Sequence, residues 1–104
     1  MGYKVYITPE ALDDLNSYIE YILEEKKNRQ AAKSILDDFE ETKKRLSLIA
    51  GNFKHVDNPI LAKMGYKRLN FIRHKYFLLF RVENDTAIVD RVFHGLQDYA
   101  RFLT

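Results

Sequence analysis

The stretch that decides the fold is GYKRLNFIRHKYFLLFRVENDTAIVDRVFHG, residues 65–95. It predicts three consecutive strands, Tyr66–Ile72, Tyr76–Val82 and Ala87–Phe93. Turn-forming residues at 83–86 separate the last two, which should therefore form a hairpin. The middle strand is apolar almost throughout, as is typical of a central strand covered on both faces.

Charged residues interrupt the apolar pattern of the last strand. Asp90 and Arg91 must contact water or a charged partner, and Arg91 is expected to pair with an acid from a neighbouring strand. For Arg81 two readings remain open: it joins a basic surface, or it forms an ion pair with Glu83 or Asp90.

The residues before this stretch predict a short strand and two helices. Tyr3–Ile7 alternates apolar and polar residues, as a strand does. Thr8 can cap a helix, and Pro9 suits the first helical position. The apolar face of this helix is expected at Leu12, Leu15, Ile19, Ile22 and Leu23.

A second helix is predicted from Arg29 to about Ala50, with Asn28 as its cap. One face carries apolar or small residues at alternating spacings of three and four, as a helix packed along a seam requires. These residues are Ala32, Ile35, Phe39, Thr42, Leu46 and Ile49. The short polar link between the helices predicts an antiparallel αα-hairpin.

Two further segments complete the predicted fold. Residues 52–64 lack a clear period and read as a loop, whereas LQDYARFLT at 96–104 can hold one or two helical turns. The fold class is therefore α+β, as one domain over 1–104. A four-stranded sheet, mixed or antiparallel, contains the N-terminal strand and the three-stranded meander. The αα-hairpin covers one face, and a short C-terminal helix follows.

Composition excludes several classes of function. The chain has no cysteine, so disulfide and thiolate chemistry are excluded, and no apolar run is long enough for a secretory signal or a membrane span. We therefore expect a cytoplasmic protein. Residues 1–52 carry eight basic and ten acidic side chains, whereas 53–104 carry nine and five. The sheet half is thus basic and suits an anionic ligand.

The ordered motifs resemble the RelE/ParE superfamily of toxins from bacterial type II toxin–antitoxin modules. The resemblance covers nearly the whole chain and rests on GYKRL at 65–69, YFLLFRV at 76–82 and DRVFHGLQDY at 90–99. It implies growth arrest and neutralisation by a small cognate antitoxin. RelE-like members cleave mRNA on the ribosome, and ParE-like members bind and poison DNA gyrase.

The nuclease branch is the first functional expectation, as a metal-independent endoribonuclease without a cofactor; the gyrase inhibitor is the alternative. In the nuclease branch the resemblance assigns chemistry to basic residues of the middle strands and to a C-terminal His or Tyr. Phe77, however, stands where that branch has a basic residue. Each candidate residue also has a purely structural alternative. His94 would end the last strand with a hydrogen bond, the arginines would be solvated charges at a sheet edge, and Tyr99 would belong to the core.

Two residues are predicted to be catalytic and four to bind substrate. His94 would move a proton near neutral pH, and Arg68 would stabilise phosphate charge. Because Lys67 alternates with Arg68, these two should point to opposite faces. His55 and His74 are expected at the surface, and the histidine spacing predicts no metal site. The substrate-binding candidates are Lys67, Arg73, Arg81 and Tyr99.

Overall fold

The computed structural model describes residues 2–52 and 56–95. Its elements confirm the predicted strand, helical hairpin and meander; the predicted C-terminal helix lies outside the described residues. In chain order they are β1 (Lys4–Ile7), α1 (Pro9–Glu24), α2 (Arg29–Ile49), the 3-10 turn η1 (Ala50–Asn52), α3 (Pro59–Lys63), β2 (Lys67–Asn70), β3 (Tyr76–Glu83) and β4 (Thr86–His94).

The strands form one mixed sheet in the order β1-β4-β3-β2. β1 runs parallel to β4, and the other two pairs are antiparallel. β1 pairs with β4 only as far as Val89, and Thr8 together with side chains of α1 lines the rest of that edge. The Thr8 hydroxyl donates to the Asp90 carbonyl at 3.0 Å, and the Tyr18 hydroxyl accepts from the His94 N–H at 3.1 Å. Backbone groups at this edge are thereby satisfied without a further strand.

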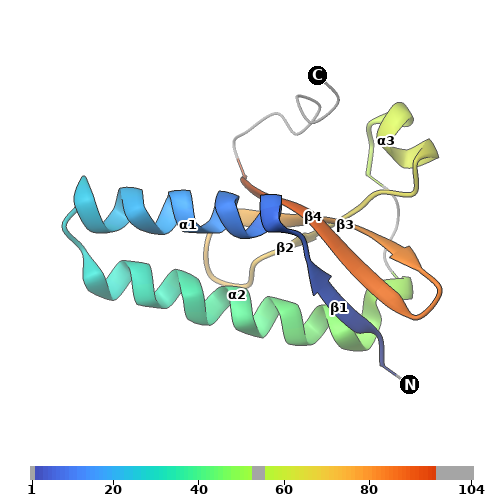
Figure 1. Cartoon of the computed structure of the whole chain (residues 1–104), viewed down its shortest axis with the longest axis horizontal. Coiled ribbons are helices and arrows are strands. Elements are labelled where there is room, and N and C mark those ends of the chain that lie inside the picture. Colours follow the sequence, from blue (N-terminus) through green and yellow to red (C-terminus); the bar gives the residue numbers. More distant parts are fainter. Residues whose placement is uncertain (1, 53–55, 96–104) are drawn as a thin grey trace.

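The two long helices begin at the predicted caps. Thr8 Oγ1 accepts from the Ala11 N–H at 3.1 Å, and Asn28 Oδ1 accepts from the Ala31 N–H at 2.9 Å. The helices run antiparallel across one face of the sheet (Figure 1). Neither of them, nor any other helix in the described part of the chain, is long and apolar enough to cross a membrane.

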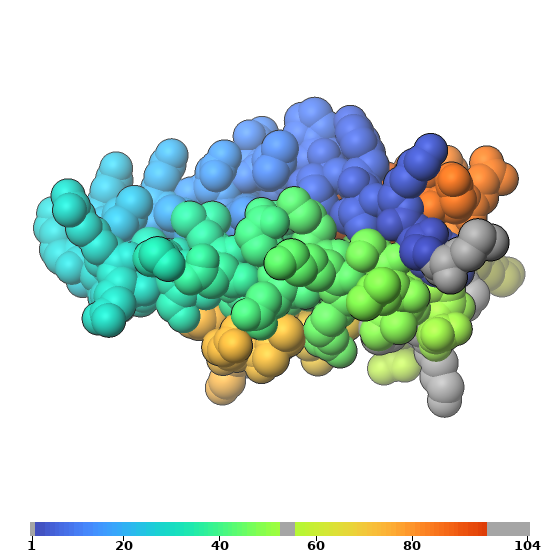
Figure 2. All heavy atoms as spheres, turned by 90° about the horizontal axis from the view of Figure 1, so that it is seen from below, coloured from blue at the N-terminus to red at the C-terminus, as the bar shows by residue number. Residues whose placement is uncertain are grey.

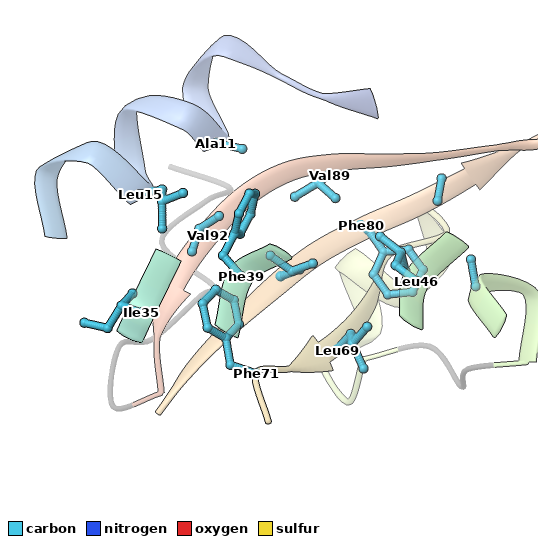
Figure 3. Close-up of a cluster of buried hydrophobic side chains, with 13 residues drawn as sticks. Ala11, Leu15, Ile35, Phe39, Leu46, Leu69, Phe71, Phe80, Val89 and Val92 are labelled. Carbon is cyan, nitrogen blue, oxygen red and sulfur yellow. The ribbon is translucent and has the colours of Figure 1, made fainter. Parts of the chain in front are cut away.

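The main core lies between the helical hairpin and the sheet. Its largest side chains include Phe39 of α2, which lies beside Phe71, and Phe80 of β3, which lies beside Leu46 (Figure 3). The buried face of α2 is the predicted one, but Leu12 and Leu23 of α1 are 44% and 39% exposed. Leu15 packs in the core as predicted, and so does Ala11, which was not among the predicted residues.

The opposite face of the sheet is partly covered by α3, a helix within the segment predicted as a loop. That prediction was wrong because Asn58 and Pro59 start a helix: Asn58 Oδ1 accepts from the N–H groups of residues 60 and 61, and Pro59 fills the first helical position. Leu61 then packs in a second apolar cluster. The other members are Val56, Tyr66, Phe77, Leu79 and Phe93. β3 is therefore buried on both faces, as predicted.

Candidate functional site

Arg68 lies on the sheet face that α3 partly covers. Its guanidinium stacks on the Phe77 ring with 3.7 Å between the guanidinium carbon and the ring centroid. Its Nε donates to Asn70 Oδ1 at 2.8 Å. Because Phe77 belongs to the second apolar cluster, Arg68 must lie on the same face of the sheet as that cluster. Stacking and the hydrogen bond together hold the side chain in one orientation.

His94 lies on the other face. It stands directly opposite Tyr76 in the β3–β4 register, and the two rings meet edge to face with centroids 5.2 Å apart. Tyr76 packs against the core beneath the helical hairpin. Arg68 and His94, which were predicted to act together, therefore belong to opposite faces of the sheet, because alternate residues of a strand point to opposite sides.

Lys67 and Arg73 are also placed apart from Arg68. Lys67 precedes Leu69 and Phe71 on the helical side of β2, opposite Phe80, as its alternation with Arg68 predicts. Arg73 Nη1 forms an ion pair with Glu41 of α2 at 2.9 Å. That contact raises the pKa of Arg73 above its ordinary value.

Arg81 forms ion pairs with both of the acids considered from the sequence. Its Nε donates to Asp90 Oδ2 at 2.9 Å, and its Nη1 pairs with Glu83. The hydrogen bond that Arg81 donates to Asp90 is the main reason that the pKa of Arg81 is raised. Burial raises the pKa of Tyr66, as does its hydrogen bond with Asp90. The two ion pairs, with Asp90 and Glu83, neutralise the charge of Arg81 within the fold.

Arg91 pairs with a helix and not, as predicted, with a neighbouring strand. Its Nε and Nη2 donate to the two carboxylate oxygens of Asp14 in α1, at 2.6 and 2.8 Å. The same carboxylate accepts from the Val92 N–H at 3.0 Å. The strand prediction was wrong because β1 ends before this part of β4, so that α1 lies along the edge.

Asp38 and His74 form a contact that the sequence reasoning missed. Asp38 is fully buried in α2 and accepts from the N–H groups of Ile72, Arg73 and His74 at 2.8–3.0 Å. It also contacts His74 Nδ1 at 2.9 Å. Figure 2 shows the segment between β2 and β3 emerging beside α2. His74, expected at the surface, is therefore only about a quarter exposed.

The pKa of Asp38 reflects two opposing effects. Burial alone would raise it, but the hydrogen bonds from the His74 side chain and from the three backbone N–H groups outweigh burial and hold the pKa below its ordinary value. Asp38 therefore stays ionised and fixes the turn. An aspartate beside another aspartate on a polar helix gave no sign of this burial in the sequence.

A cavity of about 280 Å³, here called the hairpin pocket, opens at the end of β2 and the start of β3. Its wall includes Arg68, Asn70, His74, Lys75, Tyr76 and Gly95. It brings Arg68 together with residues of the β2–β3 turn and with Tyr76 and Gly95, which adjoin His94, whereas His94 itself is not among the lining residues. Tyr99 and His55 lie outside the described residues.

The site can hold an anion, but the residues described at its wall do not form an acid–base pair around Arg68. The His74 Nδ1 is engaged with Asp38, and burial raises the pKa of the Tyr76 phenol. RNA cleavage needs a proton donor and acceptor on either side of the phosphate. Binding of negative charge is thus the chemistry that this geometry supports best.

Comparison with known proteins places these features in context. Residues 5–99 match the family model described as "ParE toxin of type II toxin-antitoxin system, parDE". A structure of the chromosomal ParDE system from P. aeruginosa superposes with a TM-score of 0.70 at 20% identity, covering 88% of this chain and 95% of that one. The RelBE2 toxin–antitoxin complex from Mycobacterium tuberculosis gives 0.58 at 22% identity, covering 90% and 92%. Among curated proteins there is no match.

Proposed function

The chain belongs to the family of ParE toxins of type II toxin–antitoxin systems, and we propose that it arrests growth by binding and inhibiting DNA gyrase. Inhibition by binding needs a complementary surface and no catalytic residues. The action takes place in the cytoplasm, where the target works. This is the second of the two branches that the sequence left open.

One observation carries this choice: Arg68 and His94 lie on opposite faces of the sheet. Arg68 stacks on Phe77 in the cluster beneath α3, whereas His94 meets Tyr76 on the side of the helical hairpin. A general acid and a phosphate-binding cation must reach the same phosphate to cleave RNA. Their separation favours a mechanism in which neither acts as a catalyst.

An exposed apolar surface on α3 supports a protein target. Ile60 and Met64 are 60% and 53% exposed on a helix of five residues and its cap. Leu61, between them, points inward and is fully buried. Methionine is enriched at the cores of protein interfaces, and the exposed isoleucine beside it adds apolar surface, so this side of α3 suits a contact with a partner.

A cognate antitoxin is the second proposed partner. Two solved structures to which the chain is similar come from toxin–antitoxin systems. The second half of the chain is basic, so an acidic antitoxin segment that folds on binding fits its charge. Addition of such an antitoxin should abolish the activity in the assays below.

Purified DNA gyrase provides the test of the proposed target. With the full chain present, supercoiling of relaxed plasmid should fall in a dose-dependent manner. His94→Ala should inhibit to the same extent, because binding does not require proton transfer. Ile60 and Met64 are exposed, and their substitution, Ile60→Asp and Met64→Asp, should reduce inhibition if α3 contributes to the interface. Full supercoiling at toxin in large excess would contradict the proposal.

Ribosome-dependent RNA cleavage is the other candidate, and one observation favours it. Arg68 and Lys75 line the same pocket and form no ion pair within the described part of the chain, so they are available to a phosphate. In a translating extract, cleavage of the message at defined codons, lost in His94→Ala, would identify this branch. An intact message together with lost supercoiling identifies the gyrase branch.

A further inference from the structure

The hairpin pocket differs from the rest of the sheet in its charge balance. Three arginines elsewhere are each paired with a carboxylate: Arg73 with Glu41, Arg81 with Asp90 and Glu83, and Arg91 with Asp14. Arg68 and Lys75 form no such pair among residues 2–52 and 56–95, and the lining residues include no Asp or Glu. Two uncompensated cations at one cavity create a positive potential that favours an anion.

Arg68 is held in the orientation that an oxyanion requires. Its plane is fixed by the Phe77 ring, and its Nε is fixed by the hydrogen bond to Asn70. The two terminal nitrogens are left without a hydrogen bond in the described structure, and they form the fork that matches two oxygens of a phosphate. Because the side chain is ordered before binding, less conformational entropy is lost when the ligand binds.

The backbone on either side of Lys75 is also fixed. Asp38 holds the three preceding N–H groups, and the Gly95 N–H donates to the Lys75 carbonyl. A Cβ at Gly95 would lie 3.1 Å from that carbonyl oxygen, which is tighter than an ordinary contact. Glycine at this position therefore lets the end of β4 approach the turn, and the pocket keeps its shape.

We propose that the hairpin pocket binds a single phosphomonoester group, either free phosphate or the phosphate of a nucleoside monophosphate. Its volume of about 280 Å³ lies just below the range of ligand sites, which begins at roughly 300 Å³. It suits one phosphate with a small substituent better than an extended chain. This inference is independent of whether the toxin acts on gyrase.

Titration of the ¹⁵N-labelled full chain by NMR tests the proposal. AMP and inorganic phosphate should shift the amide signals of residues 68–76, and adenosine should not. Equal affinity for both anions would assign the site to free phosphate; tighter binding of AMP would assign it to the nucleotide. Arg68→Gln should weaken AMP binding about tenfold or more, since it removes a charge-assisted bidentate contact.

Three further variants make the test specific. Arg45→Gln removes the same charge from an exposed position of α2 and should leave AMP binding unchanged. Arg68→Lys keeps the charge without the fork and should fall between wild type and Arg68→Gln. Lys75 is exposed, so Lys75→Gln should keep the fold and weaken AMP binding. It tests the pocket independently in case the ¹⁵N spectrum of Arg68→Gln shows that this variant is misfolded.

Three outcomes would overturn the proposal. The first is binding of adenosine as tight as that of AMP. The second is an equal loss in Arg68→Gln and Arg45→Gln, which would mean general charge attraction. The third is Arg68-dependent binding of a short single-stranded RNA with none of AMP, which would assign the pocket to a polynucleotide. Each of these readouts is separate from the gyrase assay.

Discussion

Asp14 and Asp38 look alike in the sequence but act differently in the structure. Asp14 contacts the edge strand region of β4, and Asp38 contacts the turn between β2 and β3. Each long helix carries an Asp-Asp pair whose second member faces the sheet, Asp14 in α1 and Asp38 in α2. Asp14 pairs with a guanidinium at the edge of β4 and keeps some exposure. Asp38 is fully buried and accepts mainly from backbone N–H groups. Asp14 therefore acts mainly through an ion pair with Arg91. Asp38 acts as the hydrogen-bond acceptor for backbone N–H groups of the β2–β3 turn.

The largest effect should come from Asp38→Ala. This change leaves three N–H groups of the β2–β3 turn without an acceptor and His74 without its partner. We expect a loss of about 3–5 kcal/mol in the free energy of unfolding, measured by urea denaturation. Asp37→Ala, on the adjacent exposed residue, is the matched control and should change little. Equal losses in the two variants would contradict the role assigned to Asp38.

The same carboxylate should make stability depend on pH. Because the pKa of Asp38 is lower in the folded chain, its contribution is fully present above the ordinary value of about 3.9 and is lost as the pH falls through the folded pKa. The difference in unfolding free energy between wild type and Asp38→Asn should therefore be largest near neutral pH and narrow below about pH 4. A difference that stays constant from pH 7 to pH 2 would show that ionisation of Asp38 is irrelevant.

Asp14→Ala should cost less than Asp38→Ala. It breaks the two-point contact with Arg91 and frees one N–H, but solvent reaches part of the site. A loss of about 2 kcal/mol is expected. The neighbouring Asp13 is exposed, so Asp13→Ala serves as its control in the same urea titration. If Asp14→Ala proves as harmful as Asp38→Ala, the distinction between the two aspartates fails.

The smallest effect should come from Arg73→Gln. Arg73 shares the β2–β3 turn with His74, yet its side chain pairs with Glu41 at the surface, where solvent screens the charges. The midpoint of urea denaturation should not change measurably, and inhibition by the toxin should persist. A clear fall in the midpoint would mean that the side chain, and not only the backbone N–H, holds the turn to α2.

Local patterns predicted most of the fold. The elements α1, α2 and β3 and the caps Thr8 and Asn28 depend on residues close in the sequence, and they were found where expected. Within α1, however, Leu12 and Leu23 of the predicted apolar face are exposed. α3 was missed because one turn of helix has too few residues to show a period. The parallel pairing of β1 with β4 is set by the crossover through the helices, and no pattern within β1 alone fixes it.

The candidate site was harder to predict because each arginine depends on a distant partner. Alternation along β2 separated Lys67 from Arg68 correctly, and the two acids near Arg81 were visible in the sequence. The partners of Arg91 and His74 are 77 and 36 residues away and come from the helices. Arg68 and His94 belong to opposite faces for another reason: the register of β2, β3 and β4 sets Arg68 opposite Leu79 and His94 opposite Tyr76.

The most direct test is to map RNA ends and measure plasmid supercoiling in the same translating extract after adding the full chain. If the toxin inhibits gyrase by binding, the message stays full-length, the plasmid becomes relaxed and His94→Ala behaves identically. Cuts in the message that disappear in His94→Ala, with supercoiling unchanged, would contradict this mechanism.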